Sequence, residues 1–177
     1  MGSHTRSFPT GLLPKAAGLH VRQAELHDDT LTVHLQASAS AAACLQCHQP
    51  AARIHSHYTR TAADLPWAGA AVRLVLHARK FFCTNAPCAQ RIFAERLPTV
   101  VAPRARTTVR LQDVLRAIAF ALGGEAGARL CGRLRMATSP ATLLRLIRDL
   151  TPNIRSIACE RIGPMGQGAS NEGQSIY

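Results

Sequence analysis

Four cysteines in two short pairs constrain this chain more than any other feature of its sequence. Cys44-Leu-Gln-Cys47 is a C-x-x-C pair, and a C-x-x-x-x-C pair, Cys83 to Cys88, follows after 35 intervening residues. Two such pairs, each at a turn beside strand-like sequence, supply the four soft ligands of a tetrahedral zinc site. The spacing therefore predicts one structural Zn²⁺ per chain, in a zinc ribbon whose metal replaces the core that a small β-module cannot build.

Other interpretations of the cysteines remain open from the residues alone. A C-x-x-C pair can be a redox pair, although such pairs normally open a helix and this one lies between Ala-rich coil and strands. The two pairs can also be unrelated buried cysteines, and His48, His55 or His57 can replace a thiolate ligand. The first ten residues contain no apolar stretch typical of a secretory signal, so we expect a cytoplasmic protein, in which paired cysteines usually bind metal.

The first hundred residues read as short strands and turns. Residues 18–36 predict a β-hairpin, because Leu31, Val33 and Leu35 alternate with polar residues after a turn at 27–30. Further strands are expected at 53–58, at 72–82 and at 91–96, with a turn at 65–69.

From Thr107 onward the apolar spacing becomes helical and predicts three helices. The first carries an apolar stripe and stops at Gly123-Gly124; the second has its stripe at Ala126, Leu130 and Leu134. The third begins at an N-cap Ser139 with Pro140 in the first helical position, and buries Leu143, Leu146, Ile147 and Leu150. Cys131, on the second helix, is expected to be a small buried hydrophobic residue.

The net charge indicates a polyanionic partner. The chain has 177 residues, 21 of them Lys or Arg against 10 Asp or Glu, for a formal net charge of +11. Residues 51–150 hold 16 of the basic and 5 of the acidic residues, so this segment carries the whole surplus. No apolar run approaches the length of a membrane span. The charge favours nucleic acid over a membrane or an acidic-surface enzyme.

A helix, a short turn and a last helix with a basic outer face match a helix-turn-helix unit. Specific contacts with double-stranded DNA are expected from the last helix, and phosphate contacts from the helix before it and from the β-module. The predicted DNA-binding residues are Arg129, Arg133, Thr142, Arg145, Arg148, Arg79 and Lys80. The alternative is a plain three-helix bundle with solvated arginines.

Several motifs, in order, resemble one family of transposases. They lie at residues 53–60 (Arg-Ile-His-Ser-His-Tyr-Thr-Arg), 64–67 (Asp-Leu-Pro-Trp), 72–76, 79–83, 91–98, 123–130 and 139–145. Together with the four cysteines they resemble the N-terminal half of bacterial insertion-sequence transposases of the ISL-three family, over about residues 11–150. The resemblance implies a zinc ribbon and a helix-turn-helix that recognise the terminal inverted repeats of the element.

In that family a catalytic DDE domain of RNase H-like fold follows, and this chain stops before one. We therefore expect no enzymatic activity and a truncated transposase that binds DNA, in the cytoplasm and at the nucleoid. The alternatives are an interaction module, as a homodimer or a regulator of a full-length transposase, and less favourably a thiol redox protein. No membrane role is expected.

The expected fold class is α+β, with an N-terminal β-hairpin and a zinc-ribbon β-module followed by a trihelical helix-turn-helix domain. The expected domain organisation is a flexible N-terminus (1–17), the hairpin with the zinc ribbon (18–100), the helix-turn-helix (104–152) and a disordered tail (153–177).

Overall fold

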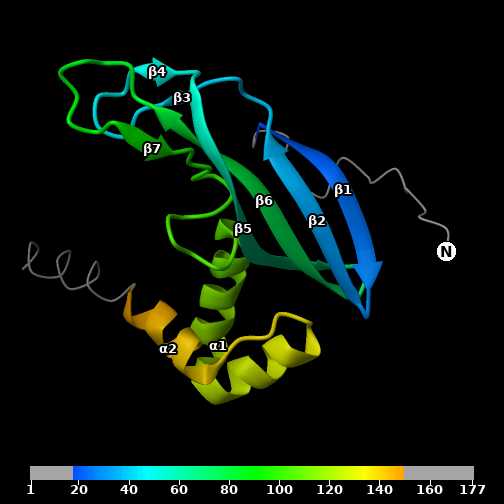
Figure 1. Ribbon diagram of the computed structural model, residues 1–177. Coiled ribbons are helices and arrows are strands. Elements are labelled where there is room, and N and C mark those ends of the chain that lie inside the picture. The colour runs from blue at the N-terminus through cyan, green and yellow to red at the C-terminus, as the bar shows by residue number, and fades with distance from the viewer. Residues whose placement is uncertain (1–17, 150–177) are drawn as a thin grey trace, which may run out of the picture.

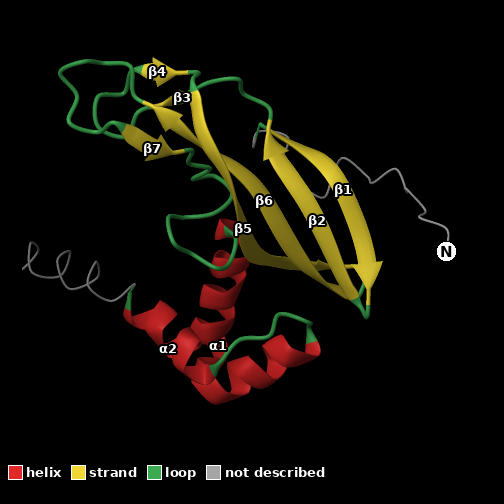
Figure 2. Cartoon of the chain, in the orientation of Figure 1, coloured by secondary structure: helices red, strands yellow, loops and turns green. Residues whose placement is uncertain are grey.

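The structure, a computed structural model, describes residues 18–149, and the two terminal segments predicted to be flexible, 1–17 and 153–177, lie outside this range. The described chain is an α+β fold in which strands precede helices (Figure 2). The elements are β1 (Leu19–His27), β2 (Thr30–Ala37), β3 (Ala42–Ala43), β4 (Pro50–Ala51), β5 (Ile54–Trp67), β6 (Ala70–Phe82), β7 (Ile92–Ala94), α1 (Val109–Arg133) and α2 (Pro140–Arg148).

β6 is the central strand of the main sheet, whose order is β1-β2-β6-β5. It pairs with β5 along its length in antiparallel register. On its other edge its first half, 71–77, pairs in parallel with β2, and its last residues, 80–82, pair with β7. Figure 1 shows β3, β4 and β7 gathered at one end of β5 and β6, with the helices on the side of β5 away from β1.

The predicted N-terminal hairpin is confirmed. β1 and β2 are antiparallel, and the turn uses Asp28 and Asp29 with positive φ values of 44° and 58°. Aspartate tolerates this left-handed conformation better than most residues, which fits the two-residue turn. The alternation in β2 is also confirmed, because every second residue from Leu31 to Ala37 is buried.

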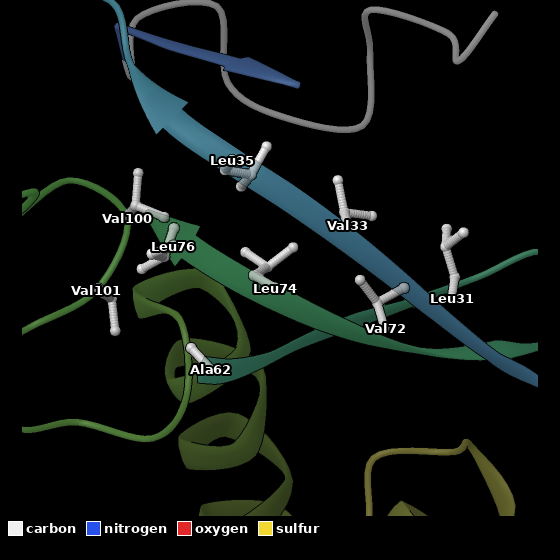
Figure 3. Close-up of a cluster of buried hydrophobic side chains, with 9 residues drawn as sticks. All are labelled: Leu31, Val33, Leu35, Ala62, Val72, Leu74, Leu76, Val100 and Val101. Atoms are coloured by element: carbon white, nitrogen blue, oxygen red, sulfur yellow. The ribbon is translucent and has the colours of Figure 1, made fainter. Parts of the chain in front are cut away.

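The core of the sheet lies on one face, between β2, β6 and the loop that follows β7. Its buried side chains are Leu31, Val33, Leu35, Ala62, Val72, Leu74, Leu76, Val100 and Val101 (Figure 3). The two valines come from the loop and close over the sheet. Arg60 holds this loop in place, because its Nη2 donates to the carbonyl oxygens of Ala102 and Ala105 at 2.8 and 2.6 Å. One face of the sheet is thus covered and the other is left open.

β5 is longer than predicted. The expected turn at 65–69 begins only at Ala68, since the strand continues through Pro66 to Trp67. Proline is tolerated here because the β5–β6 pairing is irregular between Asp64 and Trp67, so Pro66 has no register partner in the ladder.

The structure has two helices where the sequence predicts three. The backbone of Gly123 is not helical (φ 71°, ψ −163°), so α1 is divided at the predicted stop into an arm before and an arm after this residue. α2 begins as predicted, with the Ser139 hydroxyl accepting from the Thr142 N–H at 3.2 Å and Pro140 at the first helical position. Figure 2 shows α2 beside both arms of α1.

The predicted buried face of the second arm is wrong. Leu130 and Leu134 are exposed, at 37% and 45%, and the buried residues of this arm are Gly127 and Cys131. Leu143 of α2 packs so close to Gly127 that a Cβ built there would lie 2.9 Å from it. The second arm therefore contacts α2 through small residues. Cys131 is fully buried, as the sequence predicts.

Asp64 joins the helices to the sheet. Its side chain, fully buried, accepts from the Thr108 hydroxyl at 2.7 Å and from the Arg110 Nε at 2.7 Å, with a second contact from Arg110 Nη2. Thr108 is also the N-cap of α1. A parallel bridge between Ala63 and Thr107 adds backbone hydrogen bonds at the same place. The start of α1 is thus fixed to β5.

Candidate metal centre and basic surface

The four predicted zinc ligands lie at the ends of two short hairpins. Cys44 and Cys47 occupy the turn between β3 and β4, where the Cys44 N–H donates to the Gln49 carbonyl at 2.9 Å. Cys83 follows β6 directly, and its N–H donates to the Arg91 carbonyl at 2.8 Å just before β7. The backbone of each hairpin therefore positions two thiols at one point.

The geometry of the four sulfur atoms fits zinc. The Sγ atoms of Cys44 and Cys88 are 3.9 Å apart, and those of Cys47 and Cys83 are 3.6 Å apart. All four lie within 4.8 Å of one another. A tetrahedral site with zinc–sulfur bonds of ~2.3 Å has edges of about 3.8 Å between its sulfur atoms. The distances match one structural Zn²⁺, and they exclude disulfide bonds in this structure.

The ionisation of the thiols also suits a divalent cation. A hydrogen bond from the Gln49 backbone lowers the pKa of Cys47 to about 6. The Asn85 backbone acts to lower the pKa of Cys83, but burial and the neighbouring thiols outweigh it and raise that pKa to about 12. The thiol of Cys47 therefore ionises readily. Ionisation of the other thiols requires a nearby positive charge, which a bound Zn²⁺ would supply.

A small hydrophobic cluster supports the cysteines. The rings of Phe81 and Phe93 stack with centroids 5.9 Å apart, and both are buried against Cys44, Cys83 and Cys88. The histidines considered as replacement ligands, His48, His55 and His57, are exposed and belong to no metal-ligating group within residues 18–149. The C-x-x-C pair opens no helix, so the arrangement does not favour a thiol redox site.

Arg79 lies inside the protein. Its Nη2 donates to Glu95 Oε1 at 2.6 Å and its Nε to Glu95 Oε2 at 3.1 Å, and the two side chains are only 8% and 5% exposed. Nη2 also donates to the Ala39 carbonyl at 2.6 Å. Arg79 therefore stabilises the fold, which corrects the expectation that it contacts DNA. Its neighbour Lys80 is exposed, with Nζ 5.8 Å from the centre of the Tyr58 ring.

The arginines predicted to contact DNA from the helices are all at the surface. Arg129 and Arg133 are exposed on the second arm of α1, and Arg145 and Arg148 on α2, opposite the buried Leu143 and Leu146. The remaining predicted residue, Thr142, is half-buried, and its hydroxyl lies 2.9 Å from the Ser139 hydroxyl in the N-cap. The predicted DNA-binding residues at the surface therefore lie on α1 and α2, except for Lys80, which lies on β6 of the sheet.

The fold concentrates positive charge on the outside. Three of the five carboxylates in residues 51–149, those of Asp64, Glu95 and Asp113, are paired with arginines. Asp64 and Glu95 are buried and offer no negative charge to the surface. Most of the basic residues of this segment are exposed, so the excess of positive charge in the sequence lies on the protein surface.

Comparison with known proteins identifies the metal-binding segment. Residues 40–88 match a family model described as the zinc-finger of transposase IS204/IS1001/IS1096/IS1165, and this range contains all four cysteines. No curated protein and no solved structure matches the chain. Within the described residues, neither helix is long and apolar enough to cross a membrane. The match supports a transposase-related role and one structural zinc.

Proposed function

We propose that this protein binds double-stranded DNA in a sequence-specific way and recognises the terminal inverted repeats of an insertion sequence. The observation that carries the proposal is the transposase zinc ribbon at residues 40–88, joined through Asp64 to helices with exposed arginines. In this proposal zinc folds the β-module and takes no part in chemistry, and the protein itself is not a catalyst. The proposed place of action is the bacterial nucleoid.

The helices take the roles of a helix-turn-helix in this proposal. α2 presents Arg145 and Arg148 from a helix whose opposite face is buried, as a recognition helix must. Thr142 adds a further contact at the N-terminal end of α2. Arg129 and Arg133 on the preceding arm contact backbone phosphates, and Lys80 contacts a phosphate from the sheet.

The test is a DNA-binding titration of the zinc-loaded chain with duplexes that carry the ends of the parent element. Arg145→Ala is expected to cost about 1–3 kcal/mol on the specific site and to relax the preference at one base pair. Arg96→Ala, which removes an exposed arginine next to the sheet, is the matched control. An equal loss on every sequence would show that Arg145 touches only phosphate. No binding at low salt would end the proposal.

A second candidate function is protein interaction, favoured by apolar side chains on the helices. Large exposed hydrophobic residues of α1, α2 and the turn between them are Phe120, Leu122, Leu130, Leu134 and Leu144. Large exposed apolar side chains gathered on one region are typical of a protein interface. A homodimer or a complex with a full-length transposase would cover it. Sedimentation of the wild type and of Phe120→Ser, which is 74% exposed in this structure, tests the homodimer.

A further inference from the structure

The face of the main sheet opposite the core is open and carries a contact between two histidines. His34 on β2 and His77 on β6 stack with ring centroids 5.3 Å apart, and His34 Nδ1 lies 3.1 Å from His77 Nε2. Beside this pair is a depression of about 530 Å³. It is lined by Arg22, Gln36, His57, Tyr58, Thr59 and His77, which come from β1, β2, β5 and β6.

The depression is rich in positive and protonatable groups and has no carboxylate in its lining. The groups around His77 are Arg22 from β1, His34 from β2, and His57 and Tyr58 from β5. Within residues 18–149, Arg22 forms no ion pair. The acidic residue of β1, Glu25, pairs in register with Thr32 and is hydrogen-bonded to Gln23. The lining of the depression is therefore suited to an anion.

Protonation of the histidine pair is expected to be linked to the presence of an anion beside it. In a neutral pair one ring nitrogen donates and the other accepts, which the 3.1 Å distance fits. Burial, Arg22 and His34 lower the pKa of His77, because each disfavours a positive charge on its ring. An anion in the depression would offset this repulsion and favour the protonated ring. Anion binding and proton uptake at this site are therefore linked.

We propose that this depression is a binding site for a phosphate group of the DNA backbone, and that protonation of the His34–His77 pair strengthens the binding. The inference rests on the proposed function, and it adds a contact surface on the sheet to the one on the helices. Arg22 and protonated histidine are donors suited to phosphate oxygens, and Thr59 and Gln36 add a hydroxyl and an amide. A cation is disfavoured by Arg22, and these residues form no metal-ligating group of three.

The first experiment uses the zinc-loaded full chain and a fluorescent duplex, in salt series at about pH 6 and about pH 8, which bracket histidine titration. The wild type is expected to bind more tightly at the lower pH. Arg22→Gln should reduce the slope of log affinity against log salt by about 1 at both pH values, as loss of one phosphate contact does. His77→Gln should remove most of the pH dependence. The matched control is His27→Gln, whose ring is 87% exposed at the far end of β1, outside the depression.

The second experiment reads the site without DNA. Inorganic phosphate is titrated into the zinc-loaded chain while the histidine ring resonances are followed. The ring resonances of His34 and His77 should shift and the apparent pKa of His77 should rise, whereas the ring resonances of His27 should stay in place. Absence of a phosphate-dependent shift at His77 overturns the inference. The inference is also overturned if the His77→Gln variant binds DNA with the same pH dependence as the wild type. That outcome would leave the proposed function intact. Loss of all DNA binding in the wild type instead overturns the proposed function.

Discussion

The buried pair of Arg79 and Glu95 allows a sharp test of how the zinc end of the sheet is stabilised. The carboxylate receives two hydrogen bonds from the guanidinium and one, at 3.3 Å, from the Arg79 backbone N–H. Glu95→Gln keeps the shape but leaves the guanidinium charge buried without a counter-ion. Removing one partner of such a pair typically costs about 3–5 kcal/mol. Domains of this size have free energies of unfolding of about 5–15 kcal/mol, so the loss is a large fraction of the total.

The assay is urea unfolding of the zinc-loaded chain, followed by circular dichroism. The double variant Arg79→Met with Glu95→Leu removes both charges and is expected to recover most of the loss, since an apolar pair of similar volume is often as stable as a buried ion pair. The same variant should bind DNA like the wild type, because Arg79 lies inside. A cost below about 1 kcal/mol for Glu95→Gln would refute the reasoning about burial. A well-folded double variant that loses DNA binding would refute the structural role assigned to Arg79.

The remaining predictions concern the metal and the helices. Cys83→Ser, or removal of zinc by a chelator, should abolish the one-to-one zinc content measured by metal analysis and lower the unfolding temperature. At pH 7, under conditions in which the metal-free chain stays folded, Cys47 should be alkylated first, because its pKa of about 6 lies below the solution pH and the thiol is ionised. The raised pKa of Cys83 keeps that thiol protonated. Peptide mass spectrometry reads the order of alkylation, and zinc should protect both cysteines. Gly127→Val should destabilise the helices by about 1–3 kcal/mol in thermal unfolding, because its side chain overlaps the leucine packed there. Gly132→Ala is the control; nothing lies within 4 Å of its added methyl group, so it should be neutral or stabilising by up to about 1 kcal/mol.

The metal centre and the hairpin could be predicted because their signals are local. The cysteine spacing and the alternation from Leu31 to Leu35 depend on neighbours within one turn or one strand. The N-cap at Ser139 is local in the same sense. A pattern of a few residues was enough in each case.

The errors come from contacts between residues distant in sequence. The burial of Arg79 depends on its ion pair with Glu95, 16 residues later. The local sequence around Arg79 does not indicate this pairing. The second arm of α1 buries Gly127 and Cys131 because α2 packs closely against them, whereas a search for large apolar residues selects Leu130. The histidine site was also missed, because parallel pairing of β2 with β6 brings His34 next to His77, 43 residues away.

The parallel pairing of β2 with β6 also limits which fragments of the protein can keep the sheet intact. The matched segment, 40–88, contains β6 but neither β2 before it nor β7 after it. A fragment with these ends would leave Val72, Leu74 and Leu76 without the neighbouring β2 and without the loop valines that close over them, and it would lack Phe93 of the cluster around the cysteines. The segment that matches the family model is therefore smaller than the set of strands that form the sheet around it. We expect an excised ribbon to be prone to aggregation through the exposed edge of β6, so a fragment for study should include β2 and β7.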